Sequence, residues 1–185
     1  MLSAEIKNWP RNSAVSLVGL PGSGKSTIGR QLAGRLGLNF YDSDAIIERQ
    51  LGCSIREFFE REGEPAFRRI EQAVIDDLTQ KGNFVLATGG GVVLNLANRN
   101  ALRTRCQTVY LHSPPHEIFR RLRNDRNRPL LQVADPLTRL KDLYAERDHL
   151  YRETAALIVE TGPPTVSSVV RTIALQIERI GNLPS

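Results

Sequence analysis

The sequence predicts an α/β fold of three layers, in which helices cover both faces of a parallel β-sheet. Two observations support this prediction: strand candidates alternate with helix candidates along the chain, and the strand candidates are apolar throughout. A strand that is buried on both faces has no polar side, so these runs indicate a fully covered sheet. Ligands bind such sheets at the C-terminal ends of the strands, where we expect the functional residues.

Five runs of the chain are strand candidates. The first contains β-branched residues and no breaker. The third ends in three glycines and the fourth is followed by two prolines, which close both runs. The strand candidates cover about residues 14–19, 38–41, 84–88, 108–112 and 156–159.

The helix candidates fill the segments between these strands. Phe67, Ile70 and Val74 show the periodic apolar spacing of a helix that packs on a core. Gly37 is a candidate C-cap, and Pro65 suits a first helical position. The helix candidates cover about residues 24–36, 45–51, 55–61, 65–81, 96–104, 115–123, 137–151 and 166–180.

The length of 185 residues suits one compact domain. We expect this domain to cover residues 13–182, after a loose N-terminal arm of residues 1–12. The arm lacks the apolar stretch of a signal peptide, and no run approaches about 18 apolar residues, so we expect no membrane association. Cys53 and Cys106 have no metal-type spacing, and we expect them to be buried thiols in a reducing cytoplasm.

The net charge of +5 suits a partner rich in negative charge. Nucleic acid would satisfy it, and so would ATP together with a small anionic substrate. The basic segment 120–131 has no interleaved aromatic residues and no nucleic-acid-binding signature, so we expect no nucleic-acid partner. No exposed heptad or apolar stripe demands a second chain, and we expect a monomer.

A glycine-rich turn, Gly19-Leu20-Pro21-Gly22-Ser23-Gly24-Lys25-Ser26, fits G-x-x-x-x-G-K-[ST] and joins a strand candidate to a helix candidate. Its glycines allow N–H groups to form an anion-binding nest, and the helix N-terminus adds its dipole. Lys25 can reach the β- and γ-phosphates, and the Ser26 hydroxyl can bind Mg²⁺. The alternative, a plain turn with a surface lysine, is disfavoured by the flanking elements. The predicted ATP contacts here are Gly22, Ser23, Gly24, Lys25, Ser26 and Thr27.

Two carboxylates, Asp42 and Asp44, follow the second strand candidate. Both side chains can point toward one site, because they lie two residues apart at a strand end. The third strand candidate ends without a carboxylate, so Asp42 is the candidate Mg²⁺ ligand beside Ser26. Asp44 can then accept a hydrogen bond from a substrate hydroxyl. The alternative, which could coexist with function, is that Asp44 or Ser43 caps the next helix.

Further residues suit an anionic acceptor. Arg68 could hold one, although a solvated helix face is the alternative. Gly89-Gly90-Gly91 would let backbone N–H groups approach a ligand, and a tight turn is the alternative. Arg152 is a candidate second arginine for a substrate carboxylate, since that contact favours the planar guanidinium.

The basic segment suits a mobile lid of about residues 123–136 that closes over the transferring phosphate. A lid arginine would stabilise the charge of the transition state, and closure would exclude water. The three histidines, His112, His116 and His149, do not converge in the sequence, and we expect structural or surface roles for them.

This combination of motifs resembles the shikimate kinase family, from about residue 13 to residue 180. The resemblance implies a P-loop kinase fold like that of nucleoside monophosphate kinases, with a five-stranded parallel sheet and a lid. It also implies ATP-dependent phosphorylation of the 3-hydroxyl of shikimate, on the route to chorismate and the aromatic amino acids. The motifs that carry it are the glycine-rich turn through Thr27, Phe40-Tyr41-Asp42-Ser43-Asp44, Glu62-Gly63-Glu64, Phe67-Arg68-Arg69-Ile70-Glu71, Gly89-Gly90-Gly91, Arg128-Pro129-Leu130-Leu131 and Leu150-Tyr151-Arg152.

Residue roles follow from the matching motifs. The implied shikimate contacts are Asp44, Arg68, Gly90 and Arg152, with both arginines on the carboxylate. The implied catalytic residues are Lys25 and Arg128, which would stabilise the phosphoryl group in flight, and Asp44 as a candidate base. Ser26 and Asp42 would serve one Mg²⁺ ion, and Arg121 matches an arginine that packs on adenine. Arg128 would also contact ATP.

Other functions stay open at this point. A gluconate-type or nucleotide kinase of the same fold would share the phosphate site, and Arg68 with Arg152 only indicates an acceptor that bears a carboxylate. A nucleotide-dependent regulatory module is a candidate from another class, but the chain has no room for an added DNA-binding domain. A basic nucleic-acid-binding protein is disfavoured by the absence of a recognition signature.

Overall fold

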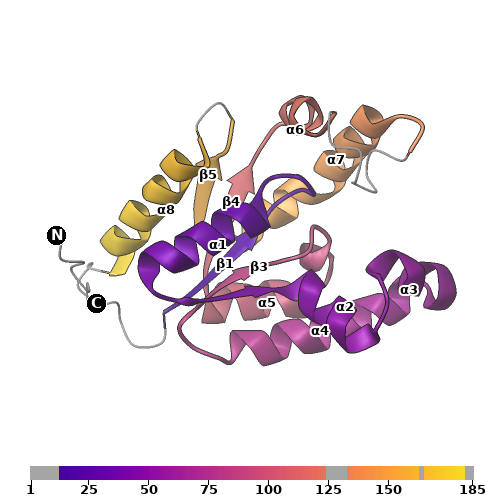
Figure 1. The fold of residues 1–185 in the computed structure, drawn as a ribbon, viewed down its shortest axis with the longest axis horizontal. Helices are drawn as coiled ribbons and strands as arrows, with labels where there is room; N and C mark the ends of the chain where they lie inside the picture. The colour runs from indigo at the N-terminus through magenta and orange to yellow at the C-terminus, as the bar shows by residue number, and fades with distance from the viewer. Residues whose placement is uncertain (1–12, 124–132, 163–164, 182–185) are drawn as a thin grey trace.

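The computed structural model describes residues 13–123, 133–162 and 165–181, which fold around a five-stranded parallel sheet (Figure 1). The strand order is β2-β3-β1-β4-β5. In the central strand, Leu17 is in register with Ala87 of β3 and Val109 of β4. The strands are β1 (Ala14–Val18), β2 (Asn39–Asp42), β3 (Phe84–Ala87), β4 (Gln107–His112) and β5 (Leu157–Glu160).

Helices connect successive strands, as parallel strands require. The helices are α1 (Lys25–Leu36), α2 (Ser43–Leu51), α3 (Ile55–Glu62), α4 (Glu64–Thr79), α5 (Leu96–Arg105), α6 (Pro115–Leu122), α7 (Pro136–Thr154) and α8 (Val166–Gly181), with a short 3₁₀ helix, η1 (Val92–Leu94), after β3. None of the described helices is long and apolar enough to cross a lipid bilayer.

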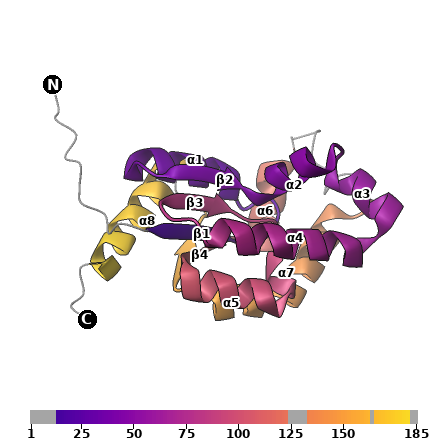
Figure 2. The same cartoon turned by 90° about the horizontal axis from the view of Figure 1, so that it is seen from below.

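Two apolar clusters sandwich the sheet, because neighbouring residues of a strand point to opposite faces. On one face, Val15 and Leu17 pack with α1 and α8. On the other, Val18 and Tyr110 pack with α4, α5 and α7. Figure 2 shows α1 on one side of the sheet and α4 and α5 on the opposite side. The predicted three-layer α/β fold with a parallel sheet is confirmed.

Most predicted elements lie within two residues of the observed bounds, and the differences have local causes. β2 extends to Asp42, whose side chain accepts a hydrogen bond from the Ala45 N–H at 3.2 Å and so caps α2. The alternative in which Asp44 or Ser43 caps this helix is therefore wrong. The 3₁₀ helix η1 was not predicted, since a three-residue turn has no periodic signal.

Three predicted features fall outside the described residues, at least in part. The arm of residues 1–12 and Arg128 lie outside them entirely. Of the predicted lid, residues 124–132 lie outside them too, while α7 begins at Pro136.

Candidate active site

A cavity of about 310 Å³ opens at the C-terminal ends of β1, β2 and β3. The expected position at the strand ends is therefore observed. Its wall brings together segments that are far apart in the sequence. The lining residues are Pro21, Gly22, Gly24, Lys25, Ser26, Thr27, Asp42, Asp44, Thr88 and Gly90.

The phosphate loop (residues 19–26) forms one wall. Gly22 and Gly24 have φ angles of 82° and 95°, in the left-handed region that glycine adopts readily. The Lys25 Nζ donates to the carbonyl oxygens of Gly19 and Leu20, at 2.7 and 2.9 Å, so its ammonium lies against the loop. α1 begins at Lys25 without a side-chain cap, which leaves first-turn N–H groups for an anion.

Ser26 and Asp42 meet at the edge of this loop. The Ser26 hydroxyl donates to Asp42 Oδ2 at 2.6 Å, while Asp42 Oδ1 caps α2. One carboxylate thereby fixes the start of a helix and a hydroxyl of the phosphate loop. These two adjacent oxygen atoms would suit a divalent cation such as Mg²⁺, which prefers oxygen ligands. Within the described residues, no group of three or more His, Cys, Asp or Glu side chains could hold a metal alone.

Asp44 lies in the first turn of α2 and faces the same cavity. Burial raises its pKa, the nearby Asp42 charge adds to this effect, and Lys25 opposes it. The side chain fits because residue 89 is glycine: an ideal Cβ there would lie 2.6 Å from Asp44 Oδ1. Asp44 therefore combines access to the cavity with an environment that favours proton uptake.

Arg68 lies on α4, held by two carboxylates. Its Nη1 is 2.9 Å from Glu71 Oε1, and its Nη2 is 3.1 Å from Glu64 Oε1. Glu71 is 1% exposed, and burial raises its pKa although Arg68 opposes the shift. A Cβ on Gly91 would overlap the Arg68 guanidinium. The ion pair and the glycine together fix the position of this arginine.

The glycine turn (residues 89–91) thus meets a different neighbour at each position. Gly89 packs on Asp44 and Gly91 packs on Arg68, as the Cβ overlaps above show. A Cβ on Gly90 would lie 2.9 Å from Pro21 Cδ of the phosphate loop. None of the three has a left-handed φ, so close approach, rather than backbone conformation, explains the glycines.

Arg147 is the residue at this site that the sequence reasoning missed. It lies on the buried side of α7, 9% exposed, close enough to Glu71 to oppose the rise of its pKa. Its Nε is buried without a hydrogen-bond partner among the described residues. Helical spacing was the available signal, because Leu140, Leu143 and Tyr151 place position 147 on the core face.

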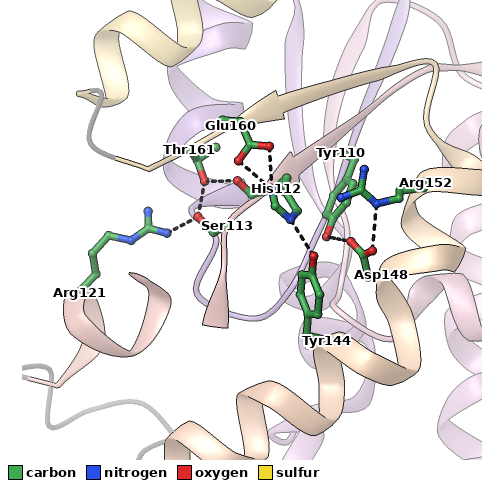
Figure 3. Close-up of polar contacts among 9 residues, drawn as sticks. All are labelled: Tyr110, His112, Ser113, Arg121, Tyr144, Asp148, Arg152, Glu160 and Thr161. Carbon is green, nitrogen blue, oxygen red and sulfur yellow. Dashed lines mark hydrogen bonds and ion pairs between the residues drawn. The ribbon is translucent and has the colours of Figure 1, made fainter. Parts of the chain in front are cut away.

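The Arg152 side chain points toward Asp148 and Tyr110, as Figure 3 shows. Its Nε lies 2.9 Å from Asp148 Oδ2, and its guanidinium lies 5.8 Å from the centre of the Tyr110 ring. Five residues along a helix amount to about 140° of rotation from Arg147. The substrate contact assigned to Arg152 stays a prediction, and the geometry favours Arg147 for it.

Arg121 lies at the end of α6, near the C-terminal ends of β4 and β5. Its Nη2 donates to Ser113 Oγ at 2.5 Å, and Ser113 Oγ lies 2.6 Å from Thr161 Oγ1 (Figure 3). Burial lowers the Arg121 pKa. The adenine contact expected for Arg121 stays a prediction.

His112, buried at the end of β4, belongs to the same hydrogen-bond network. Its Nδ1 lies 2.7 Å from Glu160 Oε2, and its Nε2 lies 3.0 Å from the Tyr144 hydroxyl (Figure 3). These contacts join β4 to β5 and α7. His112 does not line the cavity at the phosphate loop.

Comparisons with known proteins agree with this geometry. A family model described as shikimate kinase matches residues 21–178. The shikimate kinase of Paracidovorax citrulli is 54% identical over 175 residues, covering 92% of this chain and 95% of that protein. The shikimate kinase of Burkholderia lata is 50% identical over 167 residues, covering 90% and 91%.

Solved structures give the same result. The shikimate kinase of Acinetobacter baumannii in complex with shikimate superposes with a TM-score of 0.86 at 43% identity, covering 94% of this chain and 96% of that one. A gluconokinase of Sinorhizobium meliloti reaches a TM-score of 0.60 at 16% identity, covering 92% and 94%, which shows a shared fold alone. The family model and these relatives cover most of the chain, so it belongs to the shikimate kinase family.

Proposed function

We propose that this chain transfers the γ-phosphoryl group of ATP to the 3-hydroxyl of shikimate, giving shikimate 3-phosphate and ADP on the route to chorismate. Membership of the family supports the reaction. The observation in the chain itself that carries the proposal is the glycine turn, whose three residues pack against Asp44, Pro21 of the phosphate loop and Arg68. This geometry suits transfer from a bound triphosphate to a hydroxyl on a carboxylic acid.

The phosphate loop would bind ATP through its N–H groups and the N-terminus of α1. Lys25 would turn from the two loop carbonyls toward the phosphates, a short movement since those carbonyls belong to the same loop. Ser26 and Asp42 would hold one Mg²⁺ ion, which when bound offsets the negative charge of the β- and γ-phosphates. The proposed contacts of Arg121 with adenine and of Arg128 with the transferring phosphate complete this half of the site.

The acceptor half would hold shikimate by its two ends. Arg68, paired with the buried Glu71, and the buried Arg147 would bind the carboxylate. Asp44 would accept a hydrogen bond from the reacting hydroxyl, and its raised pKa suits it to take the proton as the phosphoryl group transfers. Gly90 lines the same cavity as Asp44.

We also infer a monomer in the cytoplasm, without a nucleic-acid or membrane partner. The proposed site draws every residue from one chain, so catalysis needs no second copy. Cys53 and Cys106 are both unpaired thiols, as a reducing compartment allows.

A coupled ADP-release assay with ATP, Mg²⁺ and shikimate tests the proposal, with gluconate and nucleoside monophosphates as competing acceptors. We expect release that depends on shikimate and on the divalent ion. Release with gluconate and none with shikimate would favour a gluconate-type kinase of the same fold. Release without any acceptor would indicate an ATP hydrolase.

A further inference from the structure

We propose that Tyr151 is a positioning residue that couples the carboxylate-binding Arg147 to the glycine turn. The inference rests on the proposed function, because it assigns a role at the same acceptor site. Tyr151 is fully buried in α7, and its hydroxyl donates to the Gly90 carbonyl oxygen at 2.5 Å. Arg147, four residues earlier on the same buried face of α7, lies beside this hydroxyl, where its charge opposes the rise that burial causes in the Tyr151 pKa.

The proton count limits what the Tyr151 hydroxyl can offer to Arg147. A phenol has one O–H to donate, and an arginine only donates. Since the Tyr151 proton goes to the Gly90 carbonyl, the phenolic oxygen can face Arg147 only as an acceptor. The hydroxyl thus lies between a cation on α7 and the backbone that follows β3.

A phenolic oxygen that can only accept favours one orientation of the Arg147 guanidinium. Its Nε makes no hydrogen bond within the described residues, and Glu146 Oε2 lies 3.7 Å from it. A buried guanidinium with donors left over is suited to a carboxylate ligand. Tyr151 keeps those donors in place before the ligand arrives, which lowers the ordering cost of binding.

The same hydroxyl fixes the arginine relative to the phosphate donor. Gly90, which accepts from Tyr151, packs against Pro21 of the phosphate loop. One short series of contacts therefore runs from Arg147 through Tyr151 and Gly90 to the loop that would bind ATP. This series of contacts sets how far the acceptor carboxylate lies from the γ-phosphate. Tyr151 would therefore position Arg147 without touching either substrate.

Tyr110 offers a matched control. It is fully buried, its ring centre lies 5.0 Å from that of Tyr151, and its hydroxyl donates to Asp148 Oδ1 at 2.8 Å (Figure 3). Tyr110→Phe therefore removes a buried tyrosine hydroxyl from the same region of the core. It leaves Arg147 and Gly90 with their contacts.

The experiment measures steady-state kinetics of the unaltered protein, Tyr151→Phe and Tyr110→Phe, with Arg147→Gln alone and combined with Tyr151→Phe. We expect Tyr151→Phe to raise the KM for shikimate about tenfold, with the KM for ATP within about twofold, because the hydroxyl that faces the charged Arg147 is lost. Tyr110→Phe should leave both KM values within about twofold. In the Arg147→Gln background, Tyr151→Phe should add less than about twofold, as expected for residues that act as one unit.

An equal shikimate KM for Tyr151→Phe and Tyr110→Phe, or full additivity with Arg147→Gln, would overturn the inference. Absence of shikimate-dependent turnover in the unaltered protein would instead refute the proposed function, so the two failures are distinct. If Tyr151→Phe does not fold, nuclear magnetic resonance of protein with Tyr151 intact tests the inference instead. Tyrosine is labelled with ¹³C at Cζ, and the Tyr151 signal is assigned by replacing the other three tyrosines in turn. Saturating shikimate should shift that signal. A signal that stays unmoved under saturating shikimate would also overturn the inference.

Discussion

Gly91→Ala tests whether the glycine turn positions the acceptor arginine. An ideal Cβ at residue 91 would lie 2.6 Å from Arg68 Nη1 and 2.7 Å from its Cζ, so the guanidinium must move. Movement is opposed by Glu71, which is 1% exposed and bonded to Arg68 at 2.9 Å. The substitution therefore trades a steric overlap for a disturbed buried ion pair.

The expected magnitude follows from that pair. A hydrogen bond to a charged group contributes about 1.5–3 kcal/mol, and each 1.4 kcal/mol or so is a tenfold change in affinity. We therefore expect the KM for shikimate to rise about 10- to 100-fold, while the KM for ATP stays within about twofold. Because the displaced atoms end a flexible side chain, the fold itself should persist with a lowered Tm.

The assay is ADP release at varied shikimate, with circular dichroism melting of the same samples. Gly34→Ala is the control, since a Cβ there meets nothing within 4 Å and alanine favours the α1 helix. It should leave both KM values unchanged. If folded Gly91→Ala binds shikimate as well as the unaltered protein does, the glycine does not position Arg68 and the reasoning fails.

Two further predictions concern the charges of the acceptor site. Arg147→Ala should raise the KM for shikimate at least about tenfold, whereas Arg152→Ala should change it by less than about threefold, because only Arg147 is buried beside Glu71. If steady-state kinetics showed a larger rise in the shikimate KM for Arg152→Ala than for Arg147→Ala, Arg152 would be the carboxylate ligand. Asp44→Asn should abolish turnover yet leave ATP affinity, measured by calorimetry, within a few fold. It should also raise the Tm near neutral pH, because a carboxyl whose pKa the fold raises is destabilising once ionised, and this gain should vanish as the pH falls to the ordinary aspartate range. A Tm gain that persists at low pH would show that the fold does not raise the pKa of Asp44.

The fold could be predicted from the sequence because its signals are local. Apolar strand runs, helical periodicity and the Gly-rich turn each lie within a few residues of the feature they predict. The same is true of Asp42 and Asp44, whose position at a strand end follows from the neighbouring residues. Even there the alternative in which Asp44 or Ser43 caps the helix was wrong, since Asp42 caps α2 while accepting from Ser26.

The acceptor site was harder to predict because its residues meet only in three dimensions. Glu71 matters through its burial under Arg68, which one helix sequence does not show. The glycine turn was expected to bring backbone to a ligand, whereas in the structure its close approaches are to side chains of α2 and α4 and to the phosphate loop. Arg152 was predicted as a carboxylate ligand because it follows Leu150-Tyr151, but the helix geometry of α7 puts Arg147 on the buried face.

Phosphoryl transfer to shikimate is tested most directly by ³¹P nuclear magnetic resonance of the unaltered protein mixed with ATP, Mg²⁺ and shikimate. Transfer to a bound acceptor predicts a new phosphomonoester signal that grows in step with ADP, coupled to the proton on C3 of shikimate, with no inorganic phosphate above the uncatalysed level. Inorganic phosphate appearing in step with ADP, without the phosphomonoester, would contradict the account, because the cavity would then deliver the γ-phosphate to water.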